Sequence, residues 1–201
     1  MPGAFGGYGN CVSKELQGKK IAFLVANSGV EQVELTQPWQ AVKDAGGEPV
    51  LIAPESGEIQ AFNNDVEKAD RFPVDRAVGD ASAADYDALV LPGGTTNPDT
   101  LRITPEAVSF VKDVVAAAKP VAAICHGPWS LVEAGAVRGK TLTSWPSLQT
   151  DIRNAGGTWV DEEVFVCPDN GWTLVTSRNP GDLDAFSKAL VEEFSKVKTG
   201  G

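Results

Sequence analysis

The chain has 201 residues, 42% of them hydrophobic, and carries a formal net charge of −10 at pH 7. This length suits one domain with a buried core, and the excess of acidic residues argues against nucleic acid or a membrane surface as a partner, since both require a basic face. No apolar run approaches the roughly 18 residues of a membrane span. Residues 1–10 are glycine-rich and lack the basic and apolar segments of a secretory signal, so we expect a cytoplasmic protein.

Cysteine and histidine are scarce in this sequence. The cysteines Cys11, Cys125 and Cys167 are widely separated, and His126 is the single histidine. An odd number of separated cysteines does not predict a disulfide framework, and one histidine makes a poor metal site. We therefore expect a reducing compartment, no metal and no organic cofactor. Any cysteine–histidine couple must use His126.

The first half of the chain alternates between short apolar runs and segments of helical periodicity. Residues 1–18 are glycine-rich and are predicted to form a flexible tail, followed by a single domain over 19–198. Pro38 should bend or restart its helix, and Thr104 is predicted to cap the helix that begins at Pro105. The predicted elements are strands at 20–26, 49–53, 87–91 and 121–124, short hairpin or edge pieces at 57–62 and 72–74, and helices at 31–45 and 105–118.

The second half continues the alternation. Its predicted elements are helices from 128 to about 134, at 147–154 and at 181–197, and strands at 140–143, 158–160, 164–167 and 173–176. Strands that alternate with helices of this length predict an α/β fold with a mostly parallel sheet covered on both faces. Sites in such sheets form outside the carboxyl ends of the strands, so the loops 27–31, 92–97 and 125–129 are expected to converge.

The most informative motif is Cys125-His126-Gly127-Pro128, which follows the apolar run 121–124. Gly127 and Pro128 are typical of a tight strand-to-helix turn, which places a nucleophile at the carboxyl end of a strand and the amino end of a helix. There the free N–H groups and the helix dipole favour thiolate over thiol, so Cys125 is the predicted nucleophile. The alternative is a small buried residue that ends a core strand. His126 can act as a base only if another group orients it.

The glycine pair at 93–94 follows a second buried strand. Alone, such a pair usually marks a turn that needs positive φ, and its spacing matches neither a dinucleotide fingerprint nor a P-loop. Beside a nucleophile, the bare backbone N–H groups of Gly94 and His126 are suited to hold a developing oxyanion.

Acidic and aromatic side chains near these loops are further candidates. Glu31 lies at the mouth of the expected site, where partial burial near a thiolate would raise its pKa and let it donate a hydrogen bond to sulfur. Glu34, in the same helical turn, is interpreted as a solvated partner of the helix dipole. Trp145 follows a strand end and is a candidate pocket wall. Asp99 is interpreted as a surface acid or cap.

Several long motifs resemble the PfpI (intracellular protease I) family of the class I glutamine-amidotransferase-like superfamily, which includes the Parkinsonism-associated deglycase. They are EQVEL at 31–35, DALVLPGG at 87–94, KPVAAICHGP at 119–128 and GKTLTS at 139–144. The resemblance runs from about Lys19 to Val197. It implies a flavodoxin-like three-layer sandwich and a homodimer, in some members a hexamer built from dimers.

The resemblance also implies roles for individual residues. Cys125 would be the nucleophile on a strained elbow, Glu31 the partly protonated carboxyl bonded to it, and Gly94 and His126 the oxyanion donors. In peptidase-like members a glutamate of the neighbouring subunit orients the histidine. The nearest match here is Asp99, which is one methylene shorter, in a loop that is one residue longer. This departure weakens a peptidase triad more than it weakens chemistry that relies on cysteine and glutamate.

Three functions remain open from the sequence. The leading hypothesis is a stress-related cysteine enzyme of glyoxalase or deglycase type, in which Cys125 attacks a small reactive carbonyl. The second is a cysteine peptidase or amidase that uses Cys125, His126 and Asp99 from a second subunit. The third is a non-enzymatic oxidative-stress sensor, because a reactive thiol is also readily oxidised.

Overall fold

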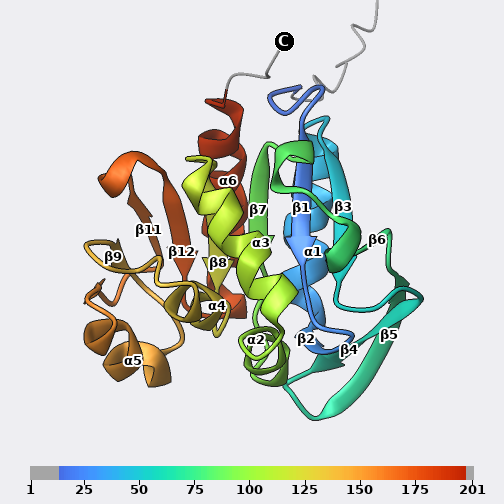
Figure 1. Ribbon diagram of the computed structural model, residues 1–201, viewed down its shortest axis with the longest axis horizontal. Helices are drawn as coiled ribbons and strands as arrows, with labels where there is room; N and C mark the ends of the chain where they lie inside the picture. The colour runs from blue at the N-terminus through green and yellow to red at the C-terminus, as the bar shows by residue number, and fades with distance from the viewer. Residues whose placement is uncertain (1–13, 198–201) are drawn as a thin grey trace, which may run out of the picture.

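A seven-stranded sheet forms the centre of the molecule in a computed structural model that describes residues 14–197 (Figure 1). Its strand order is β11-β12-β8-β7-β1-β3-β6, and all neighbours are parallel except β11 and β12. The strands are β1 (Lys20–Leu24), β3 (Glu48–Ala53), β6 (Arg76–Ala77), β7 (Ala88–Leu91), β8 (Val121–Ile124), β11 (Val164–Cys167) and β12 (Leu174–Ser177).

Helices cover both faces of this sheet. Helices α1 (Gln32–Asp44) and α6 (Leu183–Ser195) pack on one face, and α3 (Pro105–Ala116) packs on the other with α4 (Pro128–Glu133) (Figure 1). Side chains of β1 alternate between the two cores: Ile21 and Phe23 join the α1/α6 side, and Ala22 and Leu24 join the α3 side. Both faces of the strand are therefore apolar, as the continuous hydrophobic run predicts. The predicted flavodoxin-like three-layer sandwich is confirmed.

Smaller elements surround the sandwich. A three-stranded sheet joins β2 (Ser28–Glu31), β4 (Glu58–Asn63) and β5 (Glu67–Pro73), and a second pair joins β9 (Thr141–Leu142) to β10 (Thr158–Trp159). The short helices are α2 (Thr96–Leu101) and α5 (Gln149–Asn154), and α5 follows a 3₁₀ turn at Pro146–Leu148. The stretches that hold β2 and α2 were predicted as loops. Both elements are short, and β2 owes its strand form to parallel pairing with β4, a partner distant in sequence.

Three local predictions are corrected. The expected flexible tail included 14–18, but Leu16 is fully buried and its N–H donates to Ala45 O at 2.9 Å; the remaining tail, residues 1–13 with Cys11, lies outside the described residues. Helix α1 continues through Pro38 without ending. Thr104 precedes α3, yet its hydroxyl donates to Thr100 O at 3.0 Å instead of capping the helix. Within 14–197, no helix is long and apolar enough to cross a membrane.

Candidate active site

The loops after β1, β7 and β8 meet at the carboxyl ends of these strands, as the topology predicts. Asn97, at the start of α2, is fully buried and ties two of the loops together. Its Oδ1 accepts from Ala26 N at 2.6 Å, and its Nδ2 donates to Pro92 O and Gly93 O, both at 3.0 Å. Asn97 was not among the residues predicted for the site. Its buried, fully used hydrogen-bonding groups fix the glycine loop next to the nucleophile.

Cys125 occupies a strained turn between β8 and α4. Its φ is 61°, in the left-handed region that non-glycine residues rarely adopt. The turn is also tight, because a Cβ on Gly127 would lie 2.3 Å from Leu91 O. Two backbone hydrogen bonds hold the turn: Cys125 N donates to Ser177 O at 3.1 Å, and Trp145 N donates to Cys125 O at 2.9 Å. The side chain is 6% exposed, so the sulfur is held in a fixed and largely enclosed position.

The carboxyl group that contacts this sulfur belongs to Glu34, which corrects the expectation for Glu31. Glu34 is fully buried, and its Oε2 accepts from Gly93 N at 2.9 Å. Its other oxygen, Oε1, has no hydrogen-bond partner, and the neighbouring Cys125 thiol acts to lower the pKa of the carboxyl. Burial raises the pKa of Glu34 to about 8, and the charge of Glu31 adds to the effect. Glu34 is therefore protonated at neutral pH and able to donate toward sulfur.

The Cys125 thiol is also harder to ionise than a free cysteine. Burial raises its pKa, and an ionised Glu34 would raise it further, whereas the backbone N–H groups of Gly94 and His126 oppose both effects. The expected preference for thiolate at the elbow is thus outweighed by burial. Cys125 and Glu34 titrate as a coupled pair, in which loss of one proton opposes loss of the other. The N–H groups of Gly94 and His126 both point at the reacting atom, where oxyanion donors are needed.

The His126 ring lies beside the same sulfur. Its Nδ1 is 3.2 Å from Cys125 Sγ. Burial lowers the pKa of His126, with Asp65 acting in the opposite direction, so the ring is neutral at pH 7 and its nitrogen is able to accept a proton. Trp145 stacks on the ring at a centroid distance of 5.7 Å, and Trp129 meets it edge-on at 5.2 Å. Two aromatic rings therefore set the orientation of His126.

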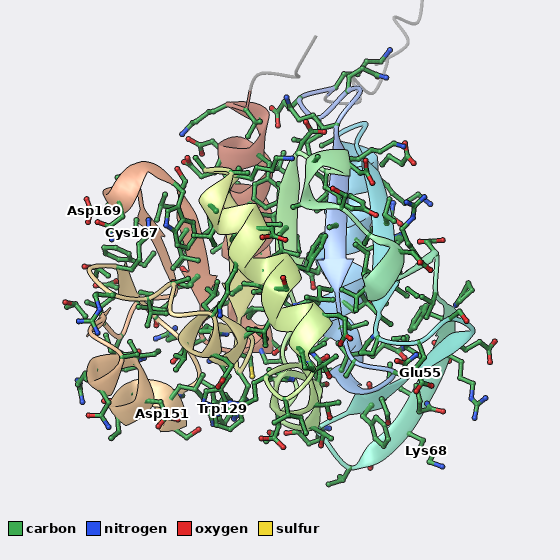
Figure 2. All side chains as sticks on the ribbon, in the orientation of Figure 1. Glu55, Lys68, Trp129, Asp151, Cys167 and Asp169 are labelled. Atoms are coloured by element: carbon green, nitrogen blue, oxygen red, sulfur yellow. The ribbon has the colours of Figure 1, made fainter. Side chains whose placement is uncertain are left out.

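Trp129 is itself anchored. Its Nε1 donates to Asp151 Oδ2 at 2.8 Å, and the two labelled side chains lie together at the edge of the molecule in Figure 2. Cys167 and Asp169 lie far from them in the same view, at the end of β11, where Cys167 Sγ contacts Asp169 Oδ2 at 3.4 Å. Cys167 is buried there and has no place in the site.

Glu31 lines the site, but its carboxylate binds the β4–β5 hairpin instead of the Cys125 sulfur. Its carboxylate accepts from Asn64 N at 3.2 Å and from Asp65 N at 3.3 Å, at the tip of the β4–β5 hairpin. Asp65 in turn accepts from Thr95 N at 2.7 Å and from Thr95 Oγ1 at 3.0 Å. Asp65 was not among the residues predicted for the site. The signal was the Asn64-Asp65 pair, a turn dipeptide, but its position depends on the pairing of β2 with β4.

These residues line an open pocket of about 110 Å³ that Cys125 also lines. Asp99 does not line it: this residue is exposed on α2 and so stands outside the site of its own chain. No cluster of three or more metal-ligating side chains occurs over 14–197. The residues that line the cavity are Glu31, Glu34, Asn64, Asp65, Gly94, Cys125, His126, Trp145 and Pro180.

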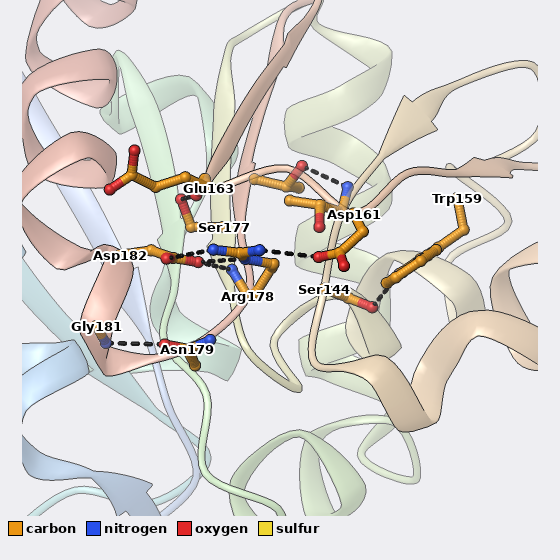
Figure 3. A network of polar contacts seen from close by, with 11 residues as sticks. Ser144, Trp159, Asp161, Glu163, Ser177, Arg178, Asn179, Gly181 and Asp182 are labelled. Carbon is orange, nitrogen blue, oxygen red and sulfur yellow. Dashed lines mark hydrogen bonds and ion pairs between the residues drawn. The ribbon is translucent and has the colours of Figure 1, made fainter.

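Pro180, on the cavity wall, is fixed by an ion-pair network at the end of β12 (Figure 3). Arg178 donates through Nε and Nη2 to the two oxygens of Asp182, each at 2.9 Å, and through Nη1 to Asp161 at 2.9 Å. Asp182 is buried and directly precedes α6 at its N-cap position. The bidentate geometry fixes the orientation of the loop that carries Pro180.

Comparison with known proteins agrees with this architecture. The model of the DJ-1/PfpI family matches residues 19–193. The chain belongs to the DJ-1/PfpI family. Among solved structures of the family, Drosophila melanogaster DJ-1beta superposes with a TM-score of 0.75 at 26% identity, covering 88% of this chain and 90% of that one.

Sequence relatives of this DJ-1/PfpI family member carry three kinds of name. General stress protein 18 of Bacillus subtilis is 41% identical, with 88% of this chain and 99% of the relative covered. Putative cysteine protease YraA of the same organism is 39% identical, with 85% and 95% covered. Deglycase PH1704 of Pyrococcus horikoshii is 40% identical, with 86% and 98% covered. The relatives therefore support a stress-related family with enzymatic members.

Proposed function

We propose that this chain is a stress-related, cysteine-dependent enzyme that acts on small reactive carbonyls in a glyoxalase- or deglycase-type reaction. The observation that carries the proposal is the contact between the Cys125 thiol and Glu34, a carboxyl that holds its proton at neutral pH. The pocket of about 110 Å³ is well below the roughly 300–1,000 Å³ of sites that hold drug-sized ligands, which favours a small dicarbonyl over a larger substrate. The names of the deglycase and stress-protein relatives agree with this choice.

The first step is addition of sulfur to the aldehyde carbon of a compound such as methylglyoxal. A carbon–sulfur bond forms, the thiol proton passes to His126 Nδ1, and the protonated Glu34 carboxyl gives its proton to the carbonyl oxygen, which yields a hemithioacetal and leaves Glu34 ionised. The 3.2 Å separation of Nδ1 and Sγ is within reach for this transfer. While charge develops on the oxygen, the N–H groups of Gly94 and His126 are the donors nearest to it.

The second step moves a proton between adjacent carbons. A base removes the proton from the carbon bound to sulfur, giving an enediol, and a proton returns to the neighbouring carbon to give a thioester. Once it has given its proton to the carbonyl oxygen, Glu34 is the base placed for this exchange, because it lies against the sulfur and its pKa of about 8 is close to neutral pH. Water then cleaves the thioester, which releases a hydroxy acid and restores the thiol. The overall reaction adds one water molecule and needs no oxidant.

Lactate formation from methylglyoxal tests the proposal. We expect lactate from the wild-type protein, none above background from Cys125→Ala, and a loss of at least 100-fold in kcat from Glu34→Gln, since general acid–base groups contribute at least that much. Glu106→Gln, a change of the same type at an exposed position of α3, should retain full activity. Equal lactate formation by Cys125→Ala and the wild-type protein would exclude the scheme.

A peptidase or amidase is the second candidate, favoured by the 3.2 Å cysteine–histidine contact and by the name of the relative YraA. It requires an acid to orient His126, and the resemblance to PfpI assigns this role to Asp99 of a second subunit in a homodimer. Asp99→Asn should then lower peptide hydrolysis by orders of magnitude without changing the mass of the assembly in light scattering. Unchanged hydrolysis in Asp99→Asn would remove this assignment.

A further inference from the structure

We propose that Asp65, at the tip of the β4–β5 hairpin, is a specificity-determining residue that disfavours anionic compounds at Cys125 and admits neutral or cationic ones. The identity of the substrates rests on the proposed carbonyl chemistry. The selection by charge does not, because it concerns access to the sulfur and applies to any reagent that reaches it.

The hairpin tip is built so that the Asp65 carboxylate has a fixed position. Asn64 and Asp65 both adopt left-handed conformations, with φ of 52° and 65°. Their N–H groups are held by the Glu31 carboxylate at 3.2 and 3.3 Å. The Asp65 side chain then binds the N–H and the hydroxyl of Thr95, directly after Gly94, whose N–H points at the sulfur. The carboxylate is therefore locked to the same loop that supplies a donor for the reacting atom.

No positive side chain balances this carboxylate within the cavity. Among the residues that line it, Glu31, Glu34 and Asp65 are acidic, and lysine and arginine are absent. His126 is the one basic group, and burial keeps it neutral at pH 7. Glu34 is protonated at this pH, so the fixed negative charge comes from Glu31 and Asp65. Of these two, Glu31 is buried at the base of the hairpin tip, and Asp65 is exposed at the mouth.

An incoming carboxylate would therefore meet like charge with no compensating partner. Because Asp65 is exposed, solvent and salt weaken the repulsion, and we expect a discrimination of about fivefold at low ionic strength. A neutral dicarbonyl would meet no such barrier, and an ammonium or guanidinium group attached to the carbonyl compound would be attracted.

Two alkylating reagents of similar size test the proposal directly. In each, the sulfur displaces iodide, a carbon–sulfur bond forms and the thiol proton leaves to solvent; iodoacetamide is neutral and iodoacetate is anionic. The rate of modification is followed at the peptide that contains Cys125 by mass spectrometry. The ratio of the iodoacetamide rate to the iodoacetate rate is compared with the same ratio for the urea-unfolded chain, which removes the intrinsic difference between the reagents.

In the wild-type protein we expect this normalised ratio to be about five. Asp65→Asn, which keeps a hydrogen-bond acceptor for Thr95, should move it clearly toward one by accelerating iodoacetate alone, with Glu31 retaining part of the preference. Glu67→Gln, a matched loss of charge on the exposed side of the same hairpin, should leave it unchanged. Thr95→Val, which removes one hydrogen bond to Asp65 but no charge, should also retain most of the preference.

An equal acceleration of both reagents in Asp65→Asn would show that Asp65 only closes the loop, and would overturn the proposal. A second test uses the wild-type protein alone. Raising the salt from 0.02 to 0.5 M should reduce the normalised ratio toward one, and an unchanged ratio would also overturn the proposal. Failure of lactate formation would remove the proposed function and leave this result standing, so the two failures are distinguishable.

Discussion

Replacement of Glu34 by glutamine should change how the stability of the protein depends on pH. Glu34 is fully buried, and burial raises its pKa in the folded protein from the ordinary 4.5 to about 8. The native state therefore keeps a proton that the unfolded chain releases above pH 4.5. The stability contributed by this group is fully present below pH 4.5, declines as the pH rises, and is lost above about pH 8.

The size of the effect follows from the two pKa values. At about 1.4 kcal/mol for each pH unit, the interval from 4.5 to about 8 corresponds to roughly 5 kcal/mol in total. Between pH 5 and pH 7 the loss is about 3 kcal/mol. The Cys125 thiol does not contribute to the change in stability between pH 5 and pH 7. Its pKa is raised from 9.0 in the folded protein, so the thiol stays protonated in both the folded and the unfolded state over this range. Glutamine is neutral throughout, so Glu34→Gln removes the decline.

Urea denaturation at half-unit intervals from pH 5 to pH 7 measures the effect. The free energy of unfolding of the wild-type protein, minus that of Glu34→Gln, should fall by about 3 kcal/mol across this range. The same difference taken with Glu106→Gln, an exposed first-turn glutamate of α3, should stay flat. A flat difference for Glu34→Gln would refute the assignment of a neutral buried carboxyl beside Cys125.

Further predictions concern packing, the ion-pair network and the histidine. Gly93→Ala places a Cβ 2.3 Å from Glu34 Oε2, so it should lower the free energy of unfolding by about 1–3 kcal/mol in urea titrations, while Gly79→Ala, in open space, changes it little. Asp182→Asn should cost about 2 kcal/mol and Asp161→Asn less than about 1 kcal/mol, because only the former side chain is buried; equal costs would contradict this. Trp145→Ala should raise the pKa of the single histidine toward 6.5 in an NMR titration, and an unmoved value would mean that the tryptophan does not bury the ring.

The sequence predicted the sandwich and the nucleophile because both depend on local patterns. Continuous apolar strands of four to six residues, separated by helical periodicity, allow few arrangements other than a parallel sheet covered on both faces. The Gly127-Pro128 pair after a buried strand likewise marks the elbow without knowledge of distant residues. These features needed no information about which segments meet in space.

The acidic residues of the site could not be assigned in the same way. Glu31 and Glu34 are three residues apart, and each residue of a helix turns by about 100°, so their directions depend on where the helix begins. The chain remains extended through Glu31 as the last residue of β2, and α1 begins at Gln32, which directs Glu34 toward the sulfur. The position of Asp65 depends on the pairing of β2 with β4, in which Glu31 lies opposite Phe62. Local sequence patterns do not predict which distant strands pair.

The most direct test of the central claim is the fate of the carbon-bound hydrogen when methylglyoxal is converted in D₂O. If Glu34 exchanges its proton with solvent during turnover, the lactate released by the wild-type protein should carry deuterium at carbon 2, which removes the coupling to the methyl signal in the proton NMR spectrum. Lactate that retains protium at carbon 2 would contradict the solvent-exchanging proton transfer assigned to Glu34 of the Cys125–Glu34 pair.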